Sequence, residues 1–256
     1  TTIVGFSSSE QYREGFGPFA GGYRLLPFGD ADAVAAAISE RTVAVLVEPI
    51  QGEAGIVIPP EGFLRRLRDI TQEHNALLIA DEIQSGLGRT GALFAFQHDR
   101  IRPDMVIVGK ALSGGCYPVS GILADSPLMD VFKPGDHGST FGGNPLGAAV
   151  AREALKVLVE EKMIENSASL GAYALERLQE IRSPHIQEVR GRGLWIGIEL
   201  NPQAGGARRF CEQLAAEGIL CKETHTHVIR VSPPLVISRQ ELDWALDRFE
   251  KVLMRP

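Results

Sequence analysis

Residues 76–82 carry the sequence ALLIADE, a continuous apolar run that ends in two acids. The run does not alternate with polar residues, so it predicts a strand buried on both faces, as in a parallel sheet. Two similar runs flank it along the chain, at 43–47 and 105–108. Apolar residues at helical spacing predict a helix over 61–75, after Pro59 and Pro60. Strand, helix and strand with short connections indicate a βαβ unit.

The remaining patterns divide the chain into two parts. Residues 119–124 predict a further strand, and long helices are expected from Pro145 onward and near 167–182. Short strands are then predicted at 186–190, 194–200 and 228–231, and helices at 208–217 and 238–253, the last capped by Ser238. We therefore expect an α/β fold with a mostly parallel sheet over residues 1–155. Long helices and a small α+β domain are expected over 156–256.

Composition places the 256-residue chain among globular proteins. Hydrophobic residues make up 44% and charged residues 23%, which excludes disorder as the main state. The longest apolar run covers residues 33–38, far short of the roughly 18 residues that a membrane span needs. We expect no signal peptide. A net charge of −6 argues against nucleic acid or an anionic membrane as the main partner. Three scattered cysteines suit a reducing compartment, so we expect a cytoplasmic protein.

An ionisable residue follows each of the three buried runs. Glu48 follows the first run, Asp81 the second, and Lys110 comes one residue after the third. In open α/β sheets, ligands bind outside the carboxyl ends of the strands. The sequence therefore predicts that a glutamate, an aspartate and a lysine meet at one edge of the sheet and form a site.

The sequence contains two segments that resemble nucleotide-binding motifs, but neither segment fits its motif. The ALLIADE segment imitates the acidic strand of P-loop ATPases, but around Lys110 the first glycine position holds Asp104 and the Ser/Thr position holds Ala111. Gly86, Gly88 and Gly91 have the spacing of the dinucleotide fingerprint, but they do not follow their strand directly. An ATPase or a dehydrogenase is therefore not expected.

A lysine and an aspartate at one sheet edge suit a different chemistry. A lysine that leaves a buried strand is desolvated, which lowers its pKa and populates the nucleophilic amine. Such a lysine can form a Schiff base. An aspartate at the neighbouring strand end can keep a pyridinium nitrogen protonated, as pyridoxal phosphate requires. This interpretation uses Asp81 and Lys110 together.

Four ordered blocks make the chain resemble the class III aminotransferases of fold type I. The blocks are EPIQGEAG at 48–55, ADEIQSG at 80–86, GKALSGG at 109–115 and HGSTFGGNP at 137–145. Within that family the chain is most similar to ornithine aminotransferases, at residues 15–19, 112–120 and 229–235. The resemblance implies transfer of the δ-amino group of ornithine to 2-oxoglutarate, which gives glutamate 5-semialdehyde and glutamate in arginine and proline metabolism.

The same resemblance implies a role for five residues toward pyridoxal 5′-phosphate. Lys110 forms the Schiff base and moves the proton between substrate carbon and cofactor. Asp81 pairs with the pyridinium nitrogen, and Gln84 bonds the phenolic oxygen. Ser139 and Thr140 reach the cofactor phosphate of a neighbouring subunit, which implies a homodimer with an active site shared across the interface.

Two further residues are implied to bind substrate. Arg230 grips the carboxylate of glutamate or 2-oxoglutarate, and Glu53 pairs with Arg230 when the donor is bound by its distal amine. An arginine fork accepts either carboxylate bidentately, so a pair that opens and closes is physically reasonable.

Three alternatives stay open. The donor is acetylornithine or 4-aminobutyrate in two of them, and in the third the chain is a non-catalytic C-terminal fragment. Family members carry a preceding portion with the glycine-rich cofactor-phosphate loop, and residues 1–4 resemble the strand that follows its stacking aromatic. We therefore expect the chain to be the C-terminal portion of a longer enzyme.

Other polar residues have simpler interpretations. Arg190 and Arg192 flank a glycine and are interpreted as parts of a solvated turn. Cys221, His225 and His227 lie at a spacing that could hold a metal, but no fourth ligand is evident, so no metal site is expected.

Overall fold

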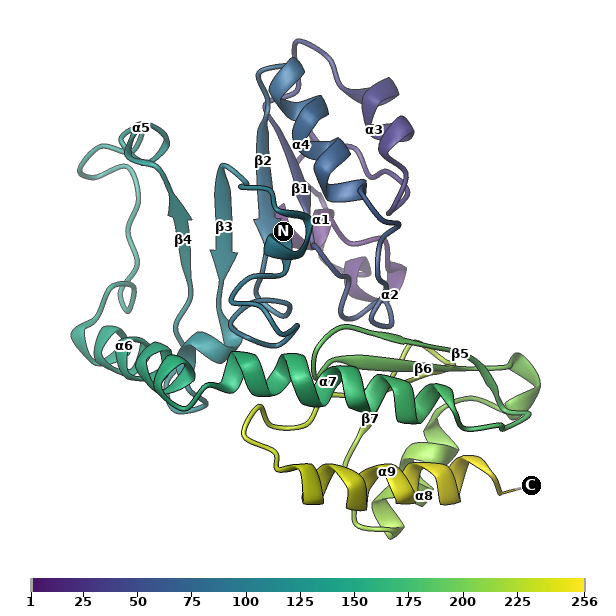
Figure 1. Cartoon of the computed structure of the whole chain (residues 1–256). Coiled ribbons are helices and arrows are strands. Elements are labelled where there is room, and N and C mark those ends of the chain that lie inside the picture. The colour runs from purple at the N-terminus through teal and green to yellow at the C-terminus, as the bar shows by residue number, and fades with distance from the viewer. Residues whose placement is uncertain (1, 256) are drawn as a thin grey trace.

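The computed structural model describes residues 2–255 and contains two four-stranded sheets (Figure 1). The first sheet has the order β1-β2-β3-β4, formed by Ala44–Val47, Leu77–Asp81, Met105–Val108 and Gly121–Ala124. The second has the order β5-β6-β8-β7, formed by Ile186–Gly191, Ile196–Leu200, Val228–Val231 and Lys222–Thr224. The partial α/β sheet followed by a smaller α+β part is confirmed.

The first sheet is parallel in three of its four strands. β1 pairs with β2 and β2 with β3 in parallel, whereas β4 runs antiparallel to β3. Helix α4 (Phe63–Glu73) connects β1 to β2 as a crossover, and its buried residues Phe63, Leu64, Leu67 and Ile70 form one core cluster with Leu78 of β2. Helix α3 (Ala31–Ala37) adds Val34 to the same cluster. The predicted βαβ unit is confirmed, and it brings the carboxyl ends of β1, β2 and β3 to one edge.

The second sheet carries the larger core. Its side chains alternate along β6: Ile196, Ile198 and Leu200 are almost fully buried in the core cluster formed with three helices. These helices are α7 (Met163–Gln179), α8 (Arg208–Ala216) and α9 (Arg239–Leu253). The N-cap predicted at Ser238 is confirmed, because its hydroxyl accepts from the Glu241 amide in a capping box.

One long helix and several short helical elements complete the chain. They are α1 (Thr2–Gly5), α2 (Glu10–Arg13), α5 (Ser126–Met129), α6 (Pro145–Glu160) and the 3₁₀ turns η1 (Ala95–Asp99), η2 (Lys110–Ser113) and η3 (Pro202–Ala204). The strand expected over residues 1–4 is wrong for its described part, which is helical, and Thr1 lies outside the described residues. The boundary predicted after residue 155 falls inside α6 and stays a prediction.

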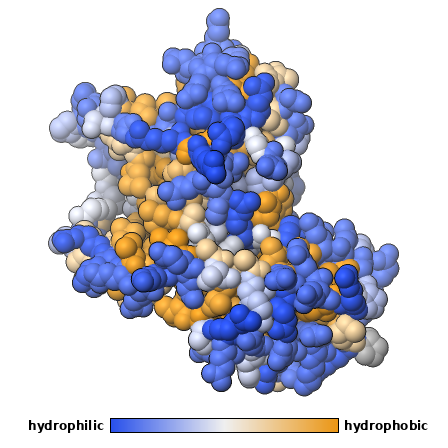
Figure 2. Space-filling view, viewed as in Figure 1, coloured by the Kyte–Doolittle hydropathy of each residue, from blue (hydrophilic) through white to orange (hydrophobic). Residues whose placement is uncertain are grey.

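The surface beside the first sheet is apolar. Figure 2 shows hydrophobic residues gathered over the middle of the molecule, next to β3 and β4. Ile122 and Leu123 of β4 are 51% and 50% exposed, and Leu46 of β1 is also exposed. Phe132 and Phe141, in the segment between α5 and α6, are exposed as well. Within residues 2–255, no helix combines the length and the apolar character needed to cross a membrane.

Candidate active site

The parallel strands β1, β2 and β3 deliver Glu48, Asp81 and Lys110 to one sheet edge, as predicted. Val47 pairs with Ala80, and Asp81 pairs with Ile107 three residues before Lys110. The three groups are close enough for Asp81 and Lys110 to perturb the pKa of Glu48. Their convergence follows from the parallel register, because the strand ends of such a sheet lie side by side.

Lys110 occupies an unusual backbone position. It begins η2 directly after Gly109, and its φ of 44° lies in the left-handed region that L-residues rarely adopt. The residue is exposed to solvent. Burial is the largest influence and lowers the pKa of Lys110. Arg230 lowers it further, whereas Glu53, Glu48 and Asp81 oppose the change. The neutral amine is therefore populated more readily than in an isolated lysine.

The two acids that end β2 face different surroundings. Asp81 accepts the Ile83 amide at 3.0 Å through one carboxylate oxygen. Glu82 is buried and accepts the Ser85 hydroxyl at 2.6 Å and the Phe96 amide at 2.9 Å. Burial raises the pKa of Glu82, although these hydrogen bonds lower it in part. Glu82 therefore anchors the following loop, and Asp81 is the acid of the two that acts on the pKa of Lys110.

Glu48 shapes the 51–57 loop, the segment that follows β1. Its carboxylate accepts the Gly52 amide at 3.1 Å. Burial raises the pKa of Glu48, and the bond from Gly52 acts in the opposite direction. The loop closes through hydrogen bonds between Gln51 and Val57, which form an isolated antiparallel bridge. Glu53 lies at the tip of this closed loop.

Glu53 and Arg230 form the ion pair that the resemblance implied. Arg230 Nη1 donates to Glu53 Oε1 at 2.9 Å, and Gln84 Nε2 donates to the same oxygen at 3.0 Å. Arg230 is 18% exposed in its side chain and Glu53 is 55% exposed. Partial burial alone would raise the pKa of Glu53, but the bonds from Arg230 and Gln84 hold it below its usual range. The pair joins the first sheet edge to β8 of the second sheet.

Ser139 and Thr140 lie apart from this network. Both are exposed in the segment between α5 and α6, and the Ser139 hydroxyl accepts the Gly142 amide at 3.0 Å. In the hydrogen bonds of residues 2–255 neither contacts Lys110, Asp81 or Gln84. Their predicted role toward a neighbouring subunit stays a prediction.

The sequence did not predict the structural roles of two arginines, Arg190 and Arg89. Arg190 is not part of a solvated turn: its side chain is 14% exposed and bonds the carbonyls of Gly55 and Ile56. Arg89 is half-buried and donates to the carbonyls of Leu194 at 2.9 Å and Pro233 at 2.7 Å. Burial lowers the pKa of Arg89 to about 10. The carbonyl partners of both arginines lie more than a hundred residues away in the chain, so local sequence holds no signal for these contacts.

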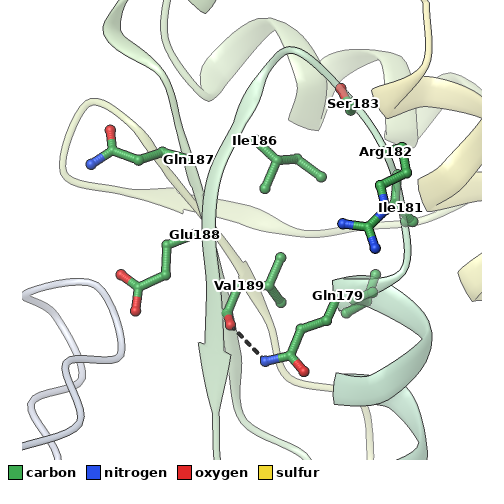
Figure 3. Close-up of a pocket in the computed structure, with 9 residues that line it drawn as sticks. Gln179, Ile181, Arg182, Ser183, Ile186, Gln187, Glu188 and Val189 are labelled. Carbon is green, nitrogen blue, oxygen red and sulfur yellow. Dashed lines mark hydrogen bonds between the residues drawn. The ribbon is translucent and has the colours of Figure 1, made fainter.

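The other singled-out groups do not join the site. In the part of the chain that the structure describes, Cys221, His225 and His227 form no group able to hold a metal ion. A cavity of about 260 Å³ lies between the end of α7 and β5, where Gln179 donates to the Val189 carbonyl (Figure 3). None of the candidate site residues lines this cavity.

The donor set at the sheet edge fits pyridoxal phosphate. A pyridine aldehyde can be attached by a lysine with a lowered pKa, such as Lys110. A carboxylate at the neighbouring strand end, Asp81, can keep its ring nitrogen protonated, and the amide of Gln84 can bond its phenolic oxygen. The chemistry of these side chains therefore admits the cofactor.

Comparison with known proteins points to one family. Residues 1–253 match the family model described as aminotransferase class-III. An ornithine aminotransferase of Brevibacillus brevis is 53% identical over 98% of this chain, and ornithine aminotransferase 2 of Staphylococcus aureus is 56% identical over 97%. The chain spans 62% of the length of each of these two relatives.

Solved structures agree with the family match. An ornithine aminotransferase from Toxoplasma gondii superposes with a TM-score of 0.96 at 42% identity, covering 98% of this chain and 60% of that one. That protein was crystallised with partial occupancy of PLP at its active site. An acetylornithine aminotransferase from Elizabethkingia anophelis superposes with a TM-score of 0.85 at 43% identity, covering 89% of this chain and 61% of that one.

Proposed function

The chain belongs to the class-III aminotransferase family, and on that premise we propose that it moves the δ-amino group of ornithine to 2-oxoglutarate. The observation that carries this proposal is the Glu53–Arg230 pair, with 2.9 Å between the charged atoms, next to Lys110. Such a pair suits an enzyme that alternates between a donor with a distal amine and an acidic acceptor, because an arginine fork can bind either carboxylate.

Pyridoxal 5′-phosphate is proposed as the cofactor. When bound, it supplies the electron sink that stabilises negative charge at the substrate carbon. Lys110 supplies the amine that holds the cofactor and then moves a proton at the substrate carbon, a task for which its lowered pKa prepares it. Asp81 has one carboxylate oxygen left to hold the ring nitrogen protonated, and Gln84 orients the phenolic oxygen.

Arg230 and Glu53 are proposed to serve both substrates. With ornithine bound by its distal amine, Glu53 neutralises Arg230, so no uncompensated cation faces the donor. With glutamate or 2-oxoglutarate bound, Glu53 turns aside and the Arg230 fork binds a carboxylate of that substrate. Because Glu53 is more exposed than Arg230, its side chain has room to move.

We further propose a cytoplasmic homodimer with a shared site. The apolar surface that includes Ile122, Leu123 and Phe141 supports association with a second copy, because monomers rarely expose contiguous apolar patches of this kind. Ser139 and Thr140 lie in the exposed segment next to it, where they can reach a neighbouring cofactor phosphate.

The attachment of the cofactor is tested by reduction. Borohydride treatment of the cofactor-loaded enzyme, followed by peptide mapping, should label Lys110. A label on another lysine would overturn the assignment. Titration of the 256-residue chain with pyridoxal phosphate, read by visible absorbance, addresses the alternative of a non-catalytic fragment. Tight binding without an added polypeptide would argue against that alternative.

The donor is tested by comparing ornithine, acetylornithine and 4-aminobutyrate at equal concentration. Ornithine should react with the highest kcat/KM. Acetylornithine differs from ornithine by an acetyl group and by the loss of one positive charge. A preference for acetylornithine would support the alternative of an acetylornithine aminotransferase, which the likeness to the Elizabethkingia enzyme favours.

A further inference from the structure

Arg190 and Arg230 lie on the same face of the second sheet, with a glycine between them. Arg190 of β5 pairs with Gly197 of β6, and Gly197 pairs with Arg230 of β8. Directly opposed residues of antiparallel strands point to the same face. The opposite face is the helix-covered core, where Ile196 and Ile198 are buried. The row Arg190–Gly197–Arg230 therefore faces the first part of the chain.

The 51–57 loop lies directly over Gly197. A Cβ atom placed on Gly197 would come within 2.8 Å of the Gly55 carbonyl oxygen and 3.3 Å of Ile56 Cβ. Such a distance to a backbone oxygen is shorter than van der Waals contact allows, so only glycine permits the loop to approach here. Gly55 itself has a φ of 113°, in the region that favours glycine. The loop thus bridges the two arginines across the glycine.

Arg190 holds the backbone of this loop. Its Nε donates to the Ile56 carbonyl at 3.0 Å and its Nη2 to the Gly55 carbonyl at 2.8 Å. Its Nη1 pairs with Glu188 at 2.7 Å and with Glu199. The two carboxylates fix the guanidinium plane, so the remaining N–H groups point at the loop.

Other contacts tether the loop at further points. The buried Thr224 hydroxyl donates to the Glu53 carbonyl oxygen. Ile56 is fully buried against Ile50 and Trp195, although its φ of 54° is costly for a β-branched residue. These contacts hold the loop in a conformation it would not adopt alone. The Glu53 carboxylate, in contrast, is 55% exposed, and among the described residues it is held by the side chains of Arg230 and Gln84.

We propose that Arg190 and Thr224 are positioning residues that fix the backbone of residues 53–56, so that the Glu53–Arg230 pair opens by rotation of the Glu53 side chain over a stationary loop. The inference rests on the proposed function, in which Arg230 binds a substrate carboxylate. Arg190 and Thr224, which do not contact substrate themselves, then influence whether the site accepts the donor or the acceptor.

Trp195 provides a readout that needs no catalysis. It is 2% exposed, and a Cβ atom on Gly52 would lie 2.9 Å from its ring, so the 51–57 loop covers it. The chain has two tryptophans, and the other, Trp244, is 44% exposed on α9. In a Trp244→Phe background, acrylamide quenching of the 256-residue chain therefore reports whether the loop is seated on Trp195.

The fluorescence experiment compares Arg190→Gln with Arg192→Gln. Both remove one positive charge, but Arg192 is exposed and makes no hydrogen bond to the 51–57 loop among the described residues. We expect the quenching constant to rise several-fold for Arg190→Gln and to stay unchanged for Arg192→Gln. Circular dichroism checks that each variant is folded. A folded Arg190→Gln with Trp195 still shielded would overturn the proposal. Should that variant not fold, Thr224→Val in the same background decides in its place.

Half-reaction kinetics test the consequence for substrate choice. For Arg190→Gln and Thr224→Val, kcat/KM for ornithine should fall about tenfold or more relative to kcat/KM for glutamate, the size expected when a catalytic group is displaced by a fraction of an ångström. Thr224→Ser should restore the ratio, because it keeps the hydroxyl. An equal fall in kcat/KM for both half-reactions would show that Arg190 and Thr224 only support the structure, and would overturn the proposal.

The two readouts separate the two proposals. If the parent enzyme does not use ornithine, the proposed function fails, while the quenching comparison still decides whether Arg190 seats the loop. If ornithine is used and quenching does not change, the positioning role fails and the proposed function stands.

Discussion

Substitution of Glu53 by glutamine tests the electrostatic core of the proposed site. Glutamine keeps the size of the side chain but removes the charge that faces Arg230 across 2.9 Å. Arg230 then stays uncompensated when ornithine occupies the site, whereas glutamate no longer competes with Glu53 for the guanidinium. We expect the ornithine half-reaction to slow and the glutamate half-reaction to be maintained or improved.

The magnitude follows from the geometry of the pair. Two unit charges about 4 Å apart attract by about 4 kcal/mol at an effective dielectric constant of about 20. Because the Glu53 side chain is 55% exposed, solvent screening removes much of this attraction and leaves about 1–2 kcal/mol. That free energy corresponds to about a 5- to 30-fold fall in the ratio of kcat/KM for ornithine to kcat/KM for glutamate.

The assay follows each half-reaction separately by stopped-flow absorbance of the cofactor. Glu212→Gln is the matched control, because Glu212 pairs with Arg208 at 2.9 Å on the surface of α8, remote from Lys110. The control should leave the ratio unchanged. If Glu53→Gln also leaves it unchanged, or lowers both half-reactions equally, the pair does not select between substrates and the reasoning is refuted.

Three further outcomes are expected. Because burial lowers the pKa of Lys110, the rate of the half-reaction should rise with pH through that lowered pKa. Between the folded and the ordinary lysine pKa the unfolded chain binds more protons than the folded chain, so the urea midpoint of unfolding should also rise with pH over this window. A midpoint that does not change with pH would contradict this prediction. Arg89→Lys replaces the planar guanidinium whose Nη1 bonds two partly buried carbonyls and should lower the free energy of unfolding by about 1–3 kcal/mol in urea titration, against no change for the exposed Arg208→Lys. Ser238→Ala removes the cap of α9 and should cost about 1 kcal/mol in the same titration; Ser238→Thr should retain most of it.

The sequence predicts those parts of the molecule that short-range patterns specify. The three apolar runs predict the parallel strands, because a continuous apolar run lacks the polar alternation of a half-exposed strand. The burial on both faces that they also predict is wrong for β1, where Leu46 is 46% exposed. Once the strands are parallel, the convergence of Glu48, Asp81 and Lys110 follows without further information. The spacing of Ser238 and Glu241 likewise predicts the start of α9.

The role of Arg190 could not be predicted in this way. A glycine after an arginine indicates a turn, and the turn does exist, but the side chain points to the Gly55 and Ile56 carbonyls across the chain. What makes that contact possible is Gly197, which leaves space over the sheet for the 51–57 loop. The helix at residues 2–5 was missed for a different reason: the strand was expected there from the family resemblance, and a segment of four residues carries too little periodicity to correct that expectation.

The electrostatics of the site belong to the junction between the two sheets. Lys110 and Asp81 come from the first sheet, whereas Arg230 comes from the second, and Glu53 stands between them on a loop held by both. Glu53 and Arg230 act on the pKa of Lys110 in opposite directions. In the proposed mechanism, a substrate carboxylate takes the place of Glu53 beside Arg230, so one negative charge replaces another at the guanidinium. On that proposal the field at Lys110 is nearly conserved between donor and acceptor, and one lysine would serve both half-reactions at the same pH.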